Sequence, residues 1–197
     1  MNSAASITEI AALPPDARIL HTAHDLFYRD GIRATGIDRV IAESGVAKKT
    51  FYRYFPSKDD LIVAFLDYRH DIWMAWFRDA LQRHGGTLAA LVPALAEWFG
   101  SEAYRGCAFI NSVVEVGGTL PQAVDIARRH KRDMTAAIRA LMPASRSAKA
   151  DAQALALAVD GAIVAAQFAD SPADALKALA RVVRAIRASA TERQIAG

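Results

Sequence analysis

The sequence predicts an all-α protein, and two observations lead to this fold class. Ala, Leu, Arg and Ile dominate the 197 residues, while runs that alternate Val, Thr or Tyr with polar residues do not occur. Apolar residues instead recur every three or four positions along most of the chain, which is the period of an amphipathic helix. With 53% apolar and 23% charged residues, the composition is that of a globular protein with a substantial core.

The amino-terminal residues predict an arm followed by a first helix. Residues 1–15 end in a Pro-Pro pair and show no sustained periodicity, so we expect a loose arm there. From Asp16 onward the apolar spacing becomes helical, and Gly31 is expected to end the helix. The residues that carry this spacing are Ile19, Leu20, Ala23, Leu26 and Phe27.

Two short helices joined by a turn are expected next. Thr35 followed three residues later by Asp38 resembles a capping box that opens the second helix. Ser44-Gly45 is expected to form the turn, and the third helix should cover residues 46–54. A helix-turn-helix of this kind places its second helix in the major groove of DNA.

The rest of the chain predicts a larger helical domain. Pro56-Ser57, with Asp60 three residues after the serine, indicates a long helix that continues to about residue 84. Gly85-Gly86 should stop it. Further helices are expected at about 88–103, where Pro93 should delay or kink the start, and at 107–116, 121–142, 150–169 and 173–190. This makes roughly nine helices in two domains, 16–60 and 61–197.

The third helix has one face suited to DNA. Residues 29–58 contain seven basic and three acidic side chains, a net charge of +4, although the whole chain carries only +3. We expect Ala47, Phe51, Tyr54 and Phe55 to pack against the first two helices, and the opposite face to present Val46, Lys48, Lys49, Thr50, Tyr52 and Arg53. Lys and Arg can neutralise phosphates or donate to guanine, and hydroxyls suit phosphate oxygens. The alternative is a solvated surface helix with no partner.

Two motifs add a family resemblance. Ala23, Leu26, Phe27, Gly31 and Thr35 fill the pattern A-x-x-L-F-x-x-x-G-x-x-x-T, and residues 45–61 fill G-V-x-x-x-T-F-Y-x-Y-F-x-S-K-x-x-L. Together, over about residues 16–65, they resemble the TetR (AcrR-type) family of bacterial transcriptional regulators. The resemblance implies an amino-terminal three-helix DNA-binding domain, a carboxyl-terminal helical ligand-binding domain, a two-fold dimer and usually repression.

The resemblance also implies which residues contact DNA. Mapped onto this chain they are Thr35, Val46, Ala47, Lys48, Lys49, Thr50, Tyr52, Tyr54 and Lys58. Two positions depart from common forms of the family: Ala47 stands where a Ser often caps the recognition helix, and Lys49 stands where Gly is frequent. Loss of the cap should cost about 1 kcal/mol of local helix stability.

Aromatic side chains in the second domain suggest an effector site. Trp73, Trp76, Phe77, Trp98, Phe99, Phe109 and Phe168 are spread over several expected helices. They can line a pocket for a hydrophobic small-molecule effector, or they can be ordinary core residues. A regulator of this architecture needs an effector cavity, which favours the pocket for the set as a whole.

Cys107, the single cysteine, and Asn111 extend the candidate ligand site. The sequence G-C-x-x-x-N at 106–111 resembles a branch of the same family in which some members sense electrophiles or oxidants through the cysteine. A thiol near a helix start and beside Arg105 can react as thiolate, although lone helical cysteines are often buried and inert. Asn111 either orients a ligand or makes an interior hydrogen bond.

The last two expected helices suggest an association surface. One apolar stripe consists of Leu155, Val159, Ala162 and Ala166, and the other of Leu176, Leu179, Val183 and Ile186. Two such helices from each subunit would form a four-helix interface with two-fold symmetry, as a palindromic DNA site requires. Alternatively, both helices cover the core of their own subunit.

Other features narrow the function class. One cysteine allows no intrachain disulfide, and the start of the chain lacks a secretion signal pattern, so we expect a soluble cytoplasmic protein. No membrane segment, metal site, cofactor or enzyme motif is expected; His21 and His24 lack a third metal ligand. The partners expected are a double-stranded DNA operator, a hydrophobic effector and a second copy of the chain. A rival is a helical small-molecule-binding protein or enzyme that has lost DNA binding.

Overall fold

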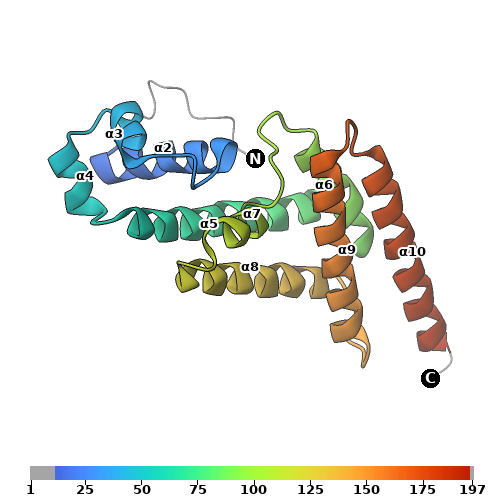
Figure 1. Cartoon of the computed structure of the whole chain (residues 1–197). Coiled ribbons are helices and arrows are strands. Elements are labelled where there is room, and N and C mark those ends of the chain that lie inside the picture. The colour runs from blue at the N-terminus through green and yellow to red at the C-terminus, as the bar shows by residue number, and fades with distance from the viewer. Residues whose placement is uncertain (1–11, 196–197) are drawn as a thin grey trace. The chain divides into compact units, whose positions relative to one another are not determined.

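A computed structural model describes residues 12–195, and within this range it contains nine α-helices, one short 3-10 helix and no strand (Figure 1). The predicted all-α fold class is confirmed. The arm expected over residues 1–15 falls mainly on residues 1–11, which lie outside the described range. The chain divides into two compact units, Met1–Ile72 with Ala108–Arg129, and Trp73–Cys107 with His130–Gly197.

The first unit contains the helix-turn-helix. Its helices are α2 (Pro15–Asp30), α3 (Ile37–Ser44), α4 (Lys48–Tyr54), the start of α5 (Lys58–Arg83), α7 (Ala108–Val116) and the start of α8 (Pro121–Arg139). Helix α2 packs against both α3 and α4. Apolar side chains with 4% exposure or less form the core here, among them Ile19, Ala23, Leu26, Phe27, Val40, Phe51, Leu61 and Phe65.

Local sequence explains how these helices begin and end. Pro15 occupies the first position of α2, and Gly31 follows its last residue with a φ of 92°. Ser57 caps α5 as predicted: its Oγ accepts a hydrogen bond from the Asp60 N–H at 3.1 Å and donates to Asp60 Oδ2 at 2.6 Å. Helix α5 then continues for 26 residues, from the first unit into the second.

The second unit is built around the last two helices. It holds the end of α5, the 3-10 helix η1 (Leu88–Ala90), α6 (Leu91–Phe99), the rest of α8, α9 (Ala148–Phe168) and α10 (Ala173–Ile195). Helices α9 and α10 lie side by side, and α10 also contacts η1 and α6 (Figure 1). None of the helices among residues 12–195 has the length and apolar character needed to cross a membrane.

The helix expected at 88–103 is the least accurate of the predicted elements. It is divided into η1 and α6, and it ends at Phe99. Pro93 lies in the first turn of α6, where a missing N–H breaks no helical hydrogen bond. Proline therefore delays the regular helix, as predicted.

Candidate functional site

The turn between α3 and α4 is fixed by Gly45. Its backbone is left-handed, with φ 65° and ψ 26°, a conformation that favours glycine. Its N–H donates to the Ala42 carbonyl at 3.3 Å, and the Ser44 hydroxyl donates to the Ile41 carbonyl at 3.2 Å. These bonds satisfy the last carbonyls of α3 and turn the chain toward α4.

Helix α4 is short and buries only one side chain completely. Phe51 is fully buried and Phe55 is half-buried, as predicted, but Ala47 and Tyr54 are exposed. The predicted inner stripe was wrong at these two positions because the helix starts at Lys48 rather than at residue 46. Ala47 is the N-cap residue and makes no capping hydrogen bond, as its side chain dictates.

The exposed face of α4 is cationic and aromatic. It consists of Ala47, Lys48, Lys49, Tyr52, Arg53 and Tyr54, with Thr50 half-buried beside them. Lys48 Nζ lies 3.2 Å from Asp38 Oδ1, and this hydrogen bond raises the lysine pKa; both side chains are exposed, so the pair is weak. The Arg53 guanidinium stacks over the Tyr54 ring, 4.9 Å from its centroid. This face can therefore offer two lysines and an oriented arginine to an anionic surface.

Three of the residues assigned to DNA contact by the family resemblance have internal roles. Thr35 is fully buried, and its hydroxyl donates to the Gly31 carbonyl at 2.8 Å, so the capping box predicted at Thr35 was wrong. Gly36 is the N-cap residue of α3 instead. Val46 is also buried, at 7% exposure. Lys58 Nζ donates to the Ile32 carbonyl at 2.7 Å, and burial lowers the pKa of this half-buried lysine.

Glu115, on α7, is a residue that no local sequence pattern singles out. Its Oε2 atom accepts a hydrogen bond from the backbone N–H of Arg33 at 2.8 Å. Arg33 belongs to the turn between α2 and α3, which Lys58 also holds. The carboxylate of α7 therefore supports the helix-turn-helix from a position 82 residues away in sequence.

In the second unit, five of the predicted ligand-site residues form one aromatic cluster. The ring of Trp73 lies 4.6 Å from Phe77, 6.1 Å from Trp76 and 5.5 Å from Trp98, measured between centroids. Phe99 packs on Trp98 at 5.9 Å. Two further rings that the sequence reasoning missed join the cluster, Tyr104 against Trp98 and Phe99, and His130 against Trp73.

The other predicted ligand-site residues lie elsewhere. Phe168 is the last residue of α9 and its side chain is 82% exposed, so its assignment to the aromatic site was wrong. Phe109 and Asn111 lie on α7 in the first unit, with Phe109 buried. Cys107 belongs to the second unit and is 4% exposed.

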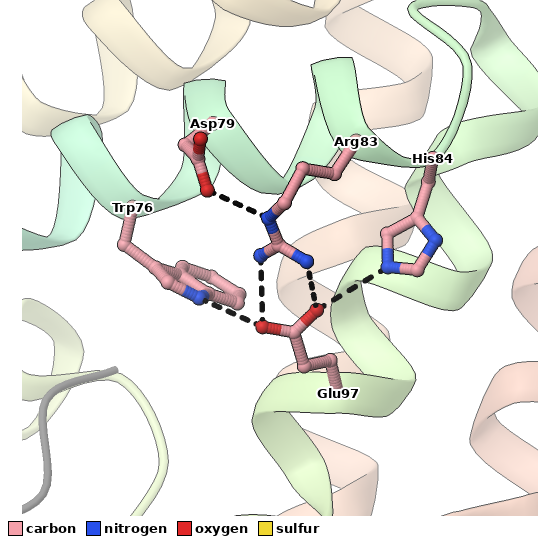
Figure 2. Close-up of polar contacts among 5 residues, drawn as sticks. All are labelled: Trp76, Asp79, Arg83, His84 and Glu97. Carbon is pink, nitrogen blue, oxygen red and sulfur yellow. Dashed lines mark hydrogen bonds and ion pairs between the residues drawn. The ribbon is translucent and has the colours of Figure 1, made fainter.

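One tryptophan of the aromatic cluster is held by a polar network around Glu97 (Figure 2). Trp76 Nε1 donates to Glu97 Oε1 at 3.2 Å, and Arg83 donates to both carboxylate oxygens at 2.9 Å. His84 and Asp79 complete the network, bound to Glu97 and Arg83 respectively. The hydrogen bonds from Arg83 lower the pKa of Glu97 to about 2, so the network joins the end of α5 to α6 at neutral pH.

Cys107 has a cationic neighbour. Lys131 Nζ lies 3.4 Å from the Cys107 Sγ atom and 2.5 Å from Asp160 Oδ1. Burial opposes the charged form of Lys131, but the attraction of Cys107 and Asp160 outweighs it and raises the lysine pKa. The predicted partner of the thiol was Arg105; its guanidinium instead donates to the carbonyls of Glu102 and Tyr104.

The predicted association stripes lie largely inside a single chain. Leu155, Val159, Ala162 and Ala166 of α9 are at most 9% exposed, and so are Leu179 and Val183 of α10; Leu176 and Ile186 are half-buried. The assignment of the α9 stripe to a subunit interface was therefore wrong, because this face of α9 is already buried within a single chain. The opposite face of α9 is also apolar, and it is exposed at Ala154, Leu157, Gly161, Ala165 and Phe168.

The first unit thus contains a helix-turn-helix whose second helix, α4, has a cationic exposed face. Comparison with known proteins identifies the same motif. Residues 19–65 match the family model of bacterial regulatory proteins, tetR family. An uncharacterized HTH-type transcriptional regulator of Lactococcus lactis is 27% identical over 104 residues, which cover 50% of this chain and 53% of that protein. The chain therefore spans about half the length of this curated relative.

Solved structures extend the likeness to most of the chain. SCO4454, a TetR-family transcriptional regulator from Streptomyces coelicolor, is 29% identical with a TM-score of 0.78, covering 92% of this chain and 94% of its own. The reduced form of Escherichia coli NemR shares the fold at 21% identity and a TM-score of 0.74, with 86% of this chain and 95% of its own covered. Residues 19–65 therefore match the DNA-binding domain of the tetR family, and most of the chain shares the fold of TetR-family transcriptional regulators.

Proposed function

We propose that this regulator is a homodimeric repressor that binds a palindromic operator and is released by a small-molecule effector. The observation that carries the DNA-binding part is the exposed face of α4, with Lys48, Lys49 and Arg53 beside Tyr52. The lysines anchor phosphates, and residues 47–50 read base edges. Thr35 and Val46 are left out of this contact set because their side chains are buried.

The exposed apolar face of α9 supports the dimer. Leu157 and Phe168 are 74% and 82% exposed, and Gly161 between them allows the backbones of two helices to approach closely. A second copy of the chain is the occupant that fits best, because two-fold symmetry places the same apolar face opposite itself. Two recognition helices about 34 Å apart can then occupy successive turns of one palindrome.

The aromatic cluster is the proposed effector site. Trp73, Trp76 and Phe77 lie on α5, the same continuous helix whose first residue, Lys58, bonds to the α2–α3 turn. A ligand that shifts α5 would therefore also shift the DNA-binding domain, to which the start of this helix is bonded. The coupling free energy is typically about 1–3 kcal/mol and must be reciprocal, so operator DNA weakens effector binding by the same factor.

A titration of fluorescent DNA from upstream of the gene tests DNA binding, at two salt concentrations. We expect the wild-type affinity to fall steeply with salt, and Lys49→Ala with Tyr52→Ala to abolish binding while helicity is unchanged. Lys177→Ala, which removes an exposed lysine on α10, is the matched control and should bind normally. Salt-independent binding, or normal binding by the double variant, would favour the rival class of a helical protein without a DNA function.

A second candidate is release by electrophiles or oxidants through Cys107. The observation that favours it is the position of the Lys131 ammonium, whose Nζ atom lies 3.4 Å from the Cys107 sulfur. Because Cys107 is buried, reaction requires local opening of the segment. Cys107→Ser should bind DNA normally and lose any response to N-ethylmaleimide; an undiminished response would eliminate this candidate.

A further inference from the structure

Two of the three tryptophans in the aromatic cluster have buried donors without an acceptor. Trp73 and Trp98 are each 2% exposed, and neither indole N–H has a hydrogen-bond partner within the described part of the chain. Trp76, the third, donates to Glu97 (Figure 2). A buried N–H without an acceptor is rare in folded proteins, because it has lost water and gained nothing in return.

The two free donors lie in one place. The rings of Trp73 and Trp98 meet edge to face, with centroids 5.5 Å apart and planes at 68°. An edge-to-face pair lets at most one N–H point at the other ring, and such an N–H···π contact is weaker than a bond to a carbonyl. The walls around them are flat: Phe77 stacks on Trp73, Tyr104 meets Trp98, and His130 meets Trp73.

We propose that Trp73 and Trp98 are the hydrogen-bond donors of the effector site and that the effector is an uncharged aromatic molecule with a carbonyl oxygen. Flat aromatic walls select a planar ligand, and two N–H donors select an acceptor on it. This assignment rests on the proposed effector function of the cluster and specifies the ligand class.

The charges around the cluster favour a neutral ligand over a carboxylate. Arg83, which shares Glu97 with Trp76, is already neutralised by Glu97 and Asp79. Lys131, the residue after His130, is paired with Asp160. Neither Arg83 nor Lys131 is therefore free to pair with an anion placed among these rings, and a buried unpaired charge is far less favourable than a hydrogen-bonded carbonyl.

The indole N–H signals of the full-length protein provide a direct test. The protein is labelled with ¹⁵N-tryptophan, which gives three indole N–H signals. These signals are assigned from the variants Trp73→Phe, Trp98→Phe and Trp76→Phe. Matched probe molecules are then added to the wild-type protein in the absence of DNA. The probe pairs are acetophenone with ethylbenzene and 2-acetylnaphthalene with 2-ethylnaphthalene, which differ in the acceptor oxygen. We expect the ketone of each pair to shift the Trp73 and Trp98 signals further downfield than its ethyl partner does, and the Trp76 signal to show no such difference between the two probes.

The affinities give a second measurement. Each of Trp73→Phe and Trp98→Phe should weaken ketone binding by about 2- to 10-fold, the range for one lost neutral hydrogen bond, and should not change binding of the ethyl compound. Val114→Ala, at an exposed position on α7 outside the aromatic cluster, is the control and should bind the ketone as the wild type does. Equal binding of ketone and ethyl compound by the wild-type protein, or ketones that move neither signal, would overturn the assignment even if the variants do not fold.

The outcome is separable from that of the proposed DNA function. If the protein binds operator DNA but binds none of the ketones, the proposed DNA-binding function stands and only the proposed ligand class is contradicted. If the protein binds ketones through Trp73 and Trp98 but does not bind DNA, the proposed ligand site stands and the proposed DNA-binding function is contradicted.

Discussion

The Glu115 carboxylate accepts a hydrogen bond from the backbone N–H of Arg33, 2.8 Å away and 82 residues earlier in the chain. The same carboxylate lies close to Gly31, where an added Cβ would be 3.3 Å from Oε2. Gly31 has φ 92° and ψ 154°, a region that is almost restricted to glycine. A single side chain of α7 thus stabilises the turn that leads from α2 into the helix-turn-helix.

Removing this carboxylate should loosen the turn. We expect Glu115→Ala to lower the free energy of unfolding by about 1–2 kcal/mol, because a backbone N–H loses a charged acceptor. Glu115→Gln retains an acceptor oxygen and should lose less. Urea titration measures both variants. If Glu115→Ala unfolds at the wild-type urea midpoint, the hydrogen bond contributes nothing to stability.

Helix starts were predicted correctly from the sequence where the residues that form the cap belong to a single segment. Ser57 and Asp60 form a side-chain cap at the predicted start of α5, because both belong to the first turn of one helix. Thr35 and Asp38 show the same pattern but do not form one, since the Thr35 hydroxyl bonds backward to the Gly31 carbonyl. A competing acceptor brought near by the fold cannot be recognised from spacing.

Helix α9 shows a second limit of prediction from sequence. Both of its faces are apolar: Leu155 and Val159 on one, Leu157 and Gly161 on the other. Apolar periodicity selects a face only when the opposite face is polar, so it could not determine which face is buried within the chain. The contacts in the candidate site could not be predicted either, because Glu115 bonds to a residue 82 positions away and Glu97 bonds to residues 13 to 21 positions away.

A charge on the exposed face of α9 should prevent dimerisation. We expect Leu157→Glu to convert a dimer to a monomer, because self-association would bury two carboxylates opposite each other in an apolar interface. Val114→Glu is the matched control, since Val114 is similarly exposed, at 82%, but lies on α7. Light scattering coupled to gel filtration measures the mass. A dimeric Leu157→Glu protein would remove α9 from the proposed interface.

The network around Glu97 predicts a loss of stability in acid. The pKa of Glu97 is about 2 in the folded protein, against an ordinary 4.5, mainly because of the hydrogen bonds from Arg83. A lowered carboxyl pKa stabilises the fold above about pH 4.5, and this contribution disappears as the pH falls toward 2. We expect the effect to be modest and weakened by salt, since both side chains are more than a third exposed.

Thermal unfolding between pH 6 and pH 2.5 tests this expectation with Glu97→Gln. The variant should lose less melting temperature over this interval than the wild type, since it has no carboxyl to protonate at this site. Asp174→Asn is the control, because Asp174 forms an exposed ion pair on α10 with no connection to the network. Identical acid profiles for Glu97→Gln and the wild type would contradict the assignment of the low pKa.

His24 predicts a second, separate pH dependence. Its Nε2 atom lies 3.4 Å from the guanidinium of Arg69, a side chain only 2% exposed, and its Nδ1 lies 2.9 Å from Asp25. The rings of Tyr28, Phe65 and Tyr68 surround it, and His21 lies one turn away on α2. Burial is the main cause that lowers the pKa of His24 below 6.5; Arg69 adds to the effect, and Asp25 opposes it.

A lowered histidine pKa means that the unfolded chain binds a proton more readily than the folded one. Stability should therefore decrease as the pH falls below about 6.5, and this decrease should continue until the lowered folded pKa is reached. We expect the urea midpoint of His24→Gln to change less between pH 7 and pH 5 than that of the wild type, because glutamine does not titrate. The slope of the midpoint against pH is the quantity to compare. His21→Gln leaves the contact between His24 and Arg69 in place and should keep the wild-type slope. If His24→Gln retains that slope as well, the protonation that destabilises the fold takes place at another group.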